Sequence, residues 1–301
     1  MKKTIILSFF LIFLISCEKE DSTNNNIIES EWTTKQFTYE HDGLIRTYIL
    51  HKPLNFVENS PLVFVLHGFG SSAMTIMTYS QMNTIADQNG FLVCYPQGSI
   101  LETGQSHWNA NLEMSSINDI DFLSQLAKSL QFNYKTNPKN TFTSGMSNGG
   151  FMSYTLGCEK SDIFKGVASV TGTMSGKDWK NCDPVNKIPA FQISGTNDTT
   201  VPWDGTMSTA YGWGGAPHIL DVMDFWADLN STSQTEKIDF PDIDSSDKST
   251  VSLTKRKAGI NNNEVWLYTV SGGGHDWPGS WGNKDIIASN EIWKFFKHHL
   301  K

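Results

Sequence analysis

The chain has 301 residues, of which 39% are hydrophobic, 18% are charged and 12% are aromatic, and its formal net charge is −8. This length suits one large domain or two small ones, and the hydrophobic fraction excludes a disordered or collagen-like chain. The acidic balance argues against a general nucleic-acid binder, which needs a basic face to neutralise phosphates.

The first residues are expected to form an export signal. A basic start is followed by an apolar run over residues 5–15. Such a run is too short to span a bilayer of ~30 Å comfortably, and a small residue follows it, as at a secretory cleavage site. We therefore expect residues 1–16 to be removed from an exported protein.

Cys17 makes this expectation more specific. The tetrapeptide Leu14-Ile15-Ser16-Cys17 resembles the bacterial lipobox, in which the cysteine is lipidated and becomes the first residue. The resemblance implies a membrane anchor at Cys17 and a charged, Asn-rich tether over residues 17–33. Acidic residues directly after the cysteine resemble the tethers of lipoproteins sent to the outer membrane or the cell surface. The alternative is an ordinary signal peptide with an incidental cysteine.

A β-hairpin is predicted to open the folded body. Two strand-like segments, at residues 37–39 and 47–50, flank Asp42-Gly43, a dipeptide typical of tight hairpin turns. A buried strand is predicted at residues 62–66, where the run is continuously apolar. Residues 77–88 have a helix-like pattern.

Strands and helices are then expected to alternate. Asn118 is a candidate N-cap for a helix whose apolar residues recur at helical spacing up to Leu130. Further strands are predicted at residues 91–95, 140–144, 166–170, 190–194, 251–257 and 265–270, and further helices at 149–157, 218–229 and 286–300. The polar segment 231–249 is expected to be an exposed excursion. This alternation predicts an α/β domain over residues 34–301, with a mostly parallel sheet covered by helices on both faces.

Three cysteines remain in this body, and export would permit disulfide bonds. Cys94 falls in a predicted buried strand, where a free thiol packs as a small hydrophobic group. Cys158 and Cys182 fall near the ends of predicted elements and are therefore the expected pair. None of the three has the spacing of a metal site.

A candidate nucleophile lies in Gly145-Met146-Ser147-Asn148-Gly149, between a predicted strand and a predicted helix. A serine there needs a sharp, strained turn, and flanking glycines let the neighbouring backbone approach without Cβ clashes. The helix N-terminus behind the turn favours developing negative charge. We therefore predict Ser147 as the nucleophile; the alternative is a Gly-rich turn with a capping serine.

A serine hydroxyl needs a base to take its proton, and the base needs an orienting carboxylate. In this architecture the expected order along the chain is Ser, Asp, His. Asp198 follows the strand predicted at 190–194, although a simple turn aspartate would look the same. His275 follows the last predicted strand on a Gly-rich loop, from which it can swing over Ser147. Asp276 beside it is expected to support that loop.

An oxyanion hole would complete such a site. The backbone N–H of Asn148, directly after the nucleophile, is one expected donor. The other is expected from the loop His67-Gly68-Phe69-Gly70, with the N–H of Phe69 as the specific choice. His67 is expected to support this loop by hydrogen bonding rather than to act as an acid or base.

These motifs together resemble the α/β-hydrolase superfamily and, more narrowly, its secreted polyhydroxybutyrate-depolymerase-like and feruloyl/acetylxylan esterase group. The resemblance covers about residues 35–300 and rests on five ordered motifs: Leu66-His67-Gly68, Tyr95-Pro96-Gln97-Gly98, Gly145 to Gly150, Gly195-Thr196-Asn197-Asp198 with Val201-Pro202-Trp203, and Gly274 to Gly279. It implies an α/β-hydrolase fold and a serine carboxylic-ester hydrolase that uses Ser147, Asp198 and His275 through an acyl-enzyme. It implies no metal and no organic cofactor.

The chain departs from this group in two ways. Relatives often carry a cysteine beside the tryptophan that corresponds to Trp108, where this chain has His107, so a disulfide bond found in some relatives is expected to be missing. We also expect no separate binding module of the kind found in secreted polymer depolymerases, which argues against action on crystalline polyester.

Tryptophans in predicted loops are candidates for a substrate wall. Trp203 and Trp277 lie within five residues of Asp198 and His275. Such rings can stack on a sugar or an aryl acyl group. Trp108 is the leading candidate for the cleft, with Asn109 as a polar contact; Trp213 and Trp281 also fall in loops. The alternative, that the rings only pack the loops, is expected to hold for about half of them.

The leading hypothesis is a lipid-anchored, monomeric serine esterase that cleaves feruloyl or acetyl groups from polysaccharides. Hydrolysis of hydroxyalkanoate oligomers is the alternative within the same class. From a different class, a non-catalytic glycan-binding lipoprotein on the hydrolase scaffold remains open, although the complete Ser, Asp and His set argues against it.

Overall fold

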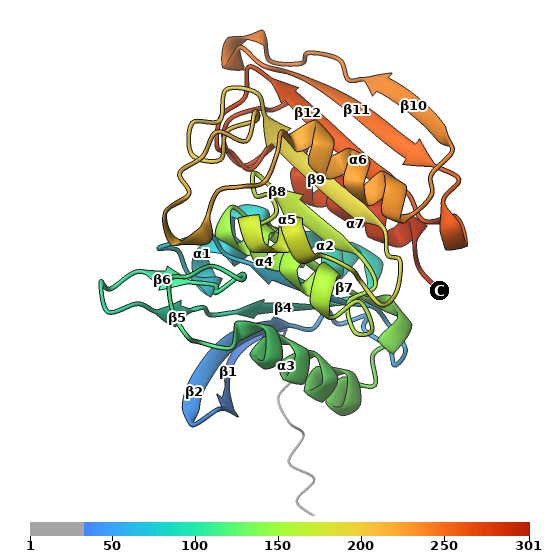
Figure 1. The fold of residues 1–301 in the computed structure, drawn as a ribbon. Helices are drawn as coiled ribbons and strands as arrows, with labels where there is room; N and C mark the ends of the chain where they lie inside the picture. The colour runs from blue at the N-terminus through green and yellow to red at the C-terminus, as the bar shows by residue number, and fades with distance from the viewer. Residues whose placement is uncertain (1–32) are drawn as a thin grey trace, which may run out of the picture. The chain divides into compact units, whose positions relative to one another are not determined.

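The computed structural model describes residues 33–301; the expected signal peptide, Cys17 and residues 17–32 of the expected tether lie outside this part of the chain. A ten-stranded sheet forms the centre of the described domain (Figure 1). Its strands are β1 (Thr34–His41), β2 (Leu44–His51), β3 (Leu62–Leu66), β4 (Leu92–Pro96), β7 (Thr141–Met146), β8 (Val167–Val170), β9 (Ala190–Gly195), β10 (Gln234–Asp239), β11 (Thr250–Lys257) and β12 (Val265–Ser271). A separate small hairpin consists of β5 (Ser99–Ile100) and β6 (Ser106–His107).

The strand order in the sheet is β1-β2-β4-β3-β7-β8-β9-β12-β11-β10. The strands from β4 to β12 in this order run parallel. The β1–β2 hairpin joins one edge antiparallel, and β11 with β10 extends the other edge antiparallel. The carboxyl ends of the parallel strands therefore meet at one edge of the sheet, where sites collect in such folds.

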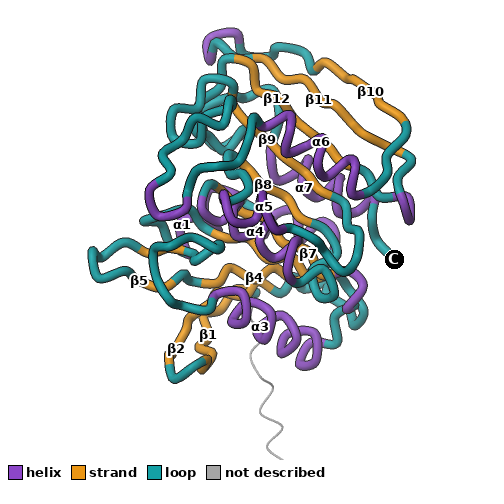
Figure 2. Tube along the Cα trace, viewed as in Figure 1, coloured by secondary structure: helices purple, strands orange, loops and turns teal. Residues whose placement is uncertain are grey.

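Helices cover both faces of the sheet (Figure 2). They are α1 (Ala73–Ser80), α2 (Met82–Asn89), α3 (Asp119–Tyr134), α4 (Asn148–Glu159), α5 (Gly176–Asn181), α6 (Ile219–Leu229) and α7 (Ala288–His298). Strand β3 shows how the faces divide, because its side chains alternate. Val63 and Val65 pack with residues of α1, α2 and α7, whereas Leu62, Phe64 and Leu66 pack with residues of α3 and α4.

The predicted α/β fold and its opening hairpin are confirmed. Asp42 and Gly43 both have positive φ, at 49° and 72°, as a two-residue hairpin turn requires. The predicted helix cap is also present, because the Asn118 side chain accepts the N–H of Asp121.

Two expectations about local structure were wrong. The helix expected over residues 77–88 is two helices, because Gln81 takes a left-handed conformation with φ of 50° that ends α1 and begins α2. The segment 231–249 is not only an excursion, since it contains β10. That edge strand is largely exposed on both faces and therefore lacks the alternation that identifies a half-buried strand.

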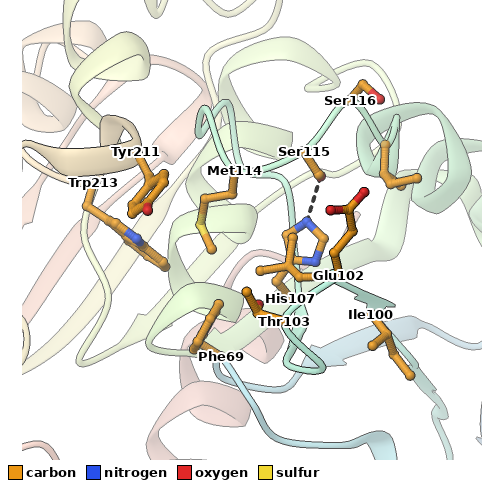
Figure 3. A pocket seen from close by; sticks show the side chains of 12 residues that line it. Phe69, Ile100, Glu102, Thr103, His107, Met114, Ser115, Ser116, Tyr211 and Trp213 are labelled. Carbon is orange, nitrogen blue, oxygen red and sulfur yellow. Dashed lines mark hydrogen bonds between the residues drawn. The ribbon is translucent and has the colours of Figure 1, made fainter.

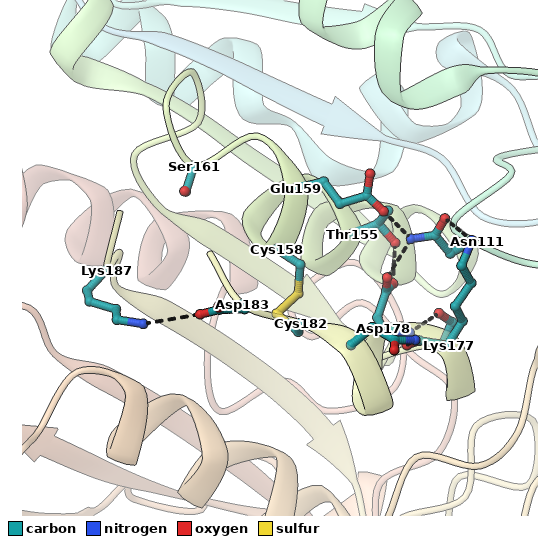
Figure 4. The surroundings of a disulfide bond; sticks show 12 residues. Asn111, Thr155, Cys158, Glu159, Ser161, Lys177, Asp178, Cys182, Asp183 and Lys187 are labelled. Atoms are coloured by element: carbon teal, nitrogen blue, oxygen red, sulfur yellow. Dashed lines mark hydrogen bonds and ion pairs between the residues drawn. A yellow bond between two sulfur atoms is a disulfide. The ribbon is translucent and has the colours of Figure 1, made fainter. Parts of the chain in front are cut away.

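A disulfide bond joins Cys158, near the end of α4, to Cys182, directly after α5 (Figure 4). Asp178 of α5 lies beside it and accepts hydrogen bonds from Thr155 and Asn111. Burial raises the pKa of Asp178, and these hydrogen bonds oppose the rise. Together the disulfide and this network attach α5 to α4, the helix that begins directly after Ser147.

Cys94 is buried in β4 as a free thiol, as expected from its apolar strand. Within residues 33–301, no helix combines the length and the apolar character needed to cross a membrane.

Candidate active site

Ser147 occupies the sharp turn between β7 and α4. Its φ of 53° and ψ of −121° place it outside the regions that a serine normally adopts, a conformation that costs about 1–3 kcal/mol and must be held by its surroundings. The Ser147 N–H donates to the Val170 carbonyl at 2.9 Å. The turn leaves the serine partly exposed at the carboxyl edge of the sheet.

The glycines on either side of Ser147 make this turn sterically feasible. A Cβ on Gly145 would lie 2.4 Å from the carbonyl of Gly149, and one on Gly149 would lie 2.3 Å from the Leu66 oxygen. Real Cβ atoms do not approach backbone so closely, so β3, β7 and α4 can pack here only around glycine.

Asp198 and His275 form a hydrogen-bonded pair. Asp198 follows β9 and His275 follows β12, and 2.7 Å separates Asp198 Oδ2 from His275 Nδ1. The Asp198 side chain is only 1% exposed and that of His275 is 22% exposed. The other carboxylate oxygen of Asp198 accepts the N–H groups of Thr200 and Val201, both at 2.8 Å. These bonds hold the carboxylate still, so His275 donates from Nδ1 and keeps Nε2 as a proton acceptor.

Ser147 and His275 both lie at the carboxyl edge, but within residues 33–301 no hydrogen bond joins the Ser147 hydroxyl to the imidazole. The structure therefore brings Asp198 and His275 into contact and leaves Ser147, the expected nucleophile, separate from them. Bonds between a nucleophile and its base are often long in ligand-free sites and tighten when substrate is bound.

The two residues expected to supply oxyanion donors flank Ser147. Asn148 is the first residue of α4, so its N–H has no partner within the helix. Its side chain is fully buried and bonds both to the N–H and to the carbonyl of Trp108, so only the backbone group is left to act. Phe69 lies beyond Gly68, where an added Cβ would contact Cβ of Ser147 at 3.4 Å. The Phe69 loop therefore packs directly against Ser147.

His67 supports this loop from inside the protein. Its Nδ1–H donates to the Gly68 carbonyl at 2.7 Å, and its Nε2 accepts the N–H of Gly98 at 2.9 Å. Burial lowers the pKa of His67 to about 4, so the ring is neutral near pH 7. Both ring nitrogens are occupied, which supports the expected structural role.

Three further side chains support the loops around the site, although the sequence alone predicted no role for them: Gln97 and the ion pair of Arg46 and Asp119. The Gln97 amide meets His67 at 3.1 Å and also accepts the N–H of Ala73. Arg46 donates to Asp119 at 2.7 Å inside the protein, and Asp119 accepts the N–H of Asn109. Gln97 lies in the motif Tyr95-Pro96-Gln97-Gly98, which was a usable signal. Asp119, the partner of Arg46, is distant in sequence, so no local pattern predicted the pair.

A cavity of about 450 Å³ opens beside Ser147. Phe69 and Trp213 form its aromatic side, and its other described lining residues are Thr199, Thr200, Val201, Pro202, Thr206, Met207 and Ser208. A second cavity of about 620 Å³ shares Phe69 and Trp213 with the first (Figure 3). Ser147 thus adjoins a cavity lined by two aromatic rings and by several hydroxyl side chains.

Three of the expected substrate contacts need correction. Trp108 is fully buried and its indole N–H donates to the His67 carbonyl at 3.0 Å. Trp277 is 1% exposed and its indole N–H bonds to Ser289 at 3.3 Å. The Asn109 amide donates to two carbonyls of the loop before α3, those of Ser115 and Ile117. These side chains support loops around the site and do not line its cavity.

Trp203 and Trp213 each line a cavity near the site. Trp203 is half-buried and lines a cavity of about 580 Å³ together with Asp198. Trp213 is also half-buried, and its ring meets Phe69 and Phe151 edge to face. Sequence reasoning placed Trp213 in a loop but did not select it, because it is distant along the chain from every motif residue.

In the described part of the chain, no group of three or more His, Cys, Asp or Glu side chains is arranged to hold a metal ion.

Known proteins resemble this chain in both sequence and fold. The family model for esterase PHB depolymerase matches residues 46–188. A bifunctional acetylxylan esterase/xylanase, XynS20E, from Neocallimastix patriciarum is 30% identical over 52% of this chain and 22% of its own length. Feruloyl esterase B from Piromyces equi is 25% identical over 76% of this chain and 42% of its own length. The chain therefore spans less than half the length of these curated relatives.

The fold resembles that of a solved acetyl xylan esterase from Aspergillus awamori, with a TM-score of 0.61. The alignment covers 88% of this chain and 99% of that one at 13% sequence identity, so it bears on the fold alone.

Proposed function

We propose that this chain, which matches the family model for esterase PHB depolymerase and has the fold of a solved acetyl xylan esterase, is a serine carboxylic-ester hydrolase working through an acyl-enzyme. The observation that carries the proposal is the arrangement at one edge of the sheet. Ser147 stands on a strained turn there, and His275 is held by Asp198 at the same edge. A strained, partly exposed serine at the same sheet edge as an oriented imidazole is an arrangement that suits acyl transfer.

In the proposed reaction, Ser147 Oγ attacks the ester carbonyl carbon while His275 Nε2 accepts the hydroxyl proton. Asp198 stabilises the resulting imidazolium through Nδ1. The carbonyl oxygen becomes an oxyanion, which accepts hydrogen bonds from the backbone N–H groups of Phe69 and Asn148. When the carbon–oxygen bond to the alcohol breaks, His275 returns its proton to the departing oxygen. Water then attacks acyl-Ser147 with His275 again as base, and this step releases the acid and restores the serine.

The substrates that we propose are feruloyl or acetyl esters carried by polysaccharides. The names of the relatives support this, since one is an acetylxylan esterase/xylanase and another a feruloyl esterase. The description of the matching family model favours a second candidate, hydrolysis of hydroxyalkanoate oligomers. Trp203 and Trp213 are the tryptophans that we propose as substrate contacts.

For the rest of the chain, we propose export and lipid anchoring at Cys17. Residues 1–16 would then be the signal peptide, residues 17–33 the tether and residues 34–301 a monomeric catalytic domain. The lipobox resemblance supports this assignment. Membrane fractionation tests it, because Cys17→Ala is expected to release an active enzyme from the membrane fraction. A variant that stays membrane-bound would contradict the anchor.

Turnover of 4-nitrophenyl acetate by the wild type and by Ser147→Ala tests the proposed activity. We expect hydrolysis by the wild type and its loss in the variant. No activity in a folded wild-type protein, or an unaffected variant, would overturn the proposal. Methyl ferulate, acetylated xylan and hydroxybutyrate oligomers then distinguish the candidate substrates.

A further inference from the structure

The second cavity is separated from Ser147 by two aromatic rings. Phe69 and Trp213 line both cavities, and their ring centroids are 6.2 Å apart with the rings edge to face. Beyond this pair, Figure 3 shows Tyr211 beside Trp213 on one side of the cavity and Glu102 with Ile100 on the other. The two cavities are therefore neighbouring compartments that share one aromatic wall.

The chemistry of the proposed reaction decides which part of an ester would enter these compartments. The departing alcohol oxygen must face His275, which protonates it. The oxyanion must face the N–H groups of Phe69 and Asn148. His275 lines neither compartment, whereas Phe69 lines both. The remaining substituent of the carbonyl carbon, the acyl group, therefore extends along the Phe69 side of Ser147 toward Trp213.

The lining of the outer compartment indicates the character of its ligand. Its surface is mostly apolar, with Phe69, Tyr211 and Trp213 as its aromatic rings. Glu102 is its one acidic side chain, and no Lys or Arg is among the described residues that line it. Such a surface suits an uncharged group with an apolar body and a few polar substituents, and it disfavours an anion.

The walls of this compartment are held in place by hydrogen bonds within the protein. His107 bonds to the Ser99 carbonyl at 3.0 Å and to the Ser115 hydroxyl at 2.7 Å, which ties the β5–β6 hairpin to the loop before α3 (Figure 3). The Asn109 amide holds the same loop through two carbonyl groups. A preformed wall lowers the ordering cost of binding.

We propose that the outer compartment is the second half of the acyl-binding site and holds the distal part of an elongated, uncharged acyl group, at least as long as an aryl-propenoyl group. This inference rests on the proposed esterase function and makes it more specific. On this proposal a two-carbon acetyl group stays in the cavity that contains Ser147 and leaves the outer compartment unused. Esters with elongated acyl groups are therefore the better substrates.

Filling the outer compartment tests this proposal. The probes are 4-nitrophenyl ferulate and 4-nitrophenyl acetate, which share a leaving group and differ only in the acyl part. Thr103→Trp and Ser116→Trp each place an indole in the outer compartment from an exposed position. Thr235→Trp, on the exposed edge strand β10, is the matched control. The readout is the ratio of kcat/KM for ferulate to kcat/KM for acetate.

We expect both filling variants to lower this ratio by about tenfold, which corresponds to about 1.4 kcal/mol of lost acyl binding, and the control to leave it unchanged. If both filling variants still hydrolyse the acetate ester and leave the ratio unchanged, the outer compartment does not bind the acyl group. The proposed esterase function would remain in place. A folded wild-type protein that hydrolyses neither probe would overturn the esterase function itself and this inference with it.

Discussion

The carboxylate of Asp198 meets His275 with one oxygen and two backbone N–H groups with the other. The His275 contact is 2.7 Å long, and the bonds from Thr200 and Val201 are both 2.8 Å. This arrangement leaves Asp198 no freedom to turn away from the imidazole. It predicts that the carboxylate orients the base and stabilises its protonated form.

Asp198→Asn is therefore expected to lower kcat on 4-nitrophenyl acetate by about 10⁴-fold, because an amide favours the wrong imidazole tautomer. Steady-state kinetics measure this effect, and circular dichroism checks that the variant is folded. Asp276→Asn is the control, since Asp276 accepts the Gly274 N–H on the same loop but does not bond to His275. Equal losses in the two variants would contradict the assignment of Asp198.

The packing of Gly149 against β3 makes a second prediction. Gly149→Ala would bring a methyl group to 2.3 Å from the Leu66 carbonyl oxygen. The expected destabilisation is about 3 kcal/mol, the upper end for overpacking, because backbone must move. Urea unfolding measures it. Gly274→Ala is a matched control, since its Cβ would meet Asp276 at an ordinary 3.5 Å, and it should change stability by less than about 1 kcal/mol. Equal stabilities of the two variants would show that the turn tolerates a side chain.

The burial of Trp108 makes a third prediction. Trp108→Phe removes the indole N–H that bonds to the His67 carbonyl and should cost about 2 kcal/mol of stability with little change in KM. Trp213→Ala opens the shared aromatic wall and should raise KM for 4-nitrophenyl ferulate about tenfold. Urea unfolding and steady-state kinetics on both variants test the distinction. If Trp108→Phe raises KM without losing stability, Trp108 contacts the substrate and the structural role is wrong.

The buried neutral His67 predicts a pH-dependent stability. Burial lowers its pKa to about 4 from the ordinary 6.5, so over this interval the unfolded chain binds a proton that the folded protein does not. Stability therefore falls as the pH drops from 6.5 toward 4, and His67 accounts for about 2–3 kcal/mol of the loss by pH 4.5.

Urea unfolding of the wild type and of His67→Gln at pH 7 and pH 4.5 measures this contribution. The variant should lose less stability on acidification than the wild type. His299, whose pKa burial lowers to about 3, is present in both proteins and cancels in the comparison. The same acid-induced loss in both proteins would show that His67 does not carry the effect.

The sequence predicted local structure well, but it did not predict the directions of the loop side chains. The opening hairpin, the alternating elements and the turn at Ser147 follow from short patterns, because turn chemistry and periodicity act over a few residues. The exposed edge strand β10 lacks such a pattern and was missed.

The direction of a loop side chain depends on partners far along the chain. Trp108 and Trp277 were expected in the cleft because they fall in loops near motifs, yet each indole N–H finds a buried partner instead. Trp213 lies in the loop region that follows β9, and its ring contacts Phe69 in the loop that follows β3. No local sequence pattern predicts this contact.

The central claim is that Ser147 carries the acyl group, and covalent labelling tests it most directly. The folded wild-type protein would be treated with a serine-reactive fluorophosphonate, digested and mapped by mass spectrometry. The account predicts one adduct per chain on the peptide that contains Ser147, loss of esterase activity in step with labelling, and no adduct in Ser147→Ala. An active protein that stays unlabelled at Ser147, or activity that survives complete labelling, would contradict it.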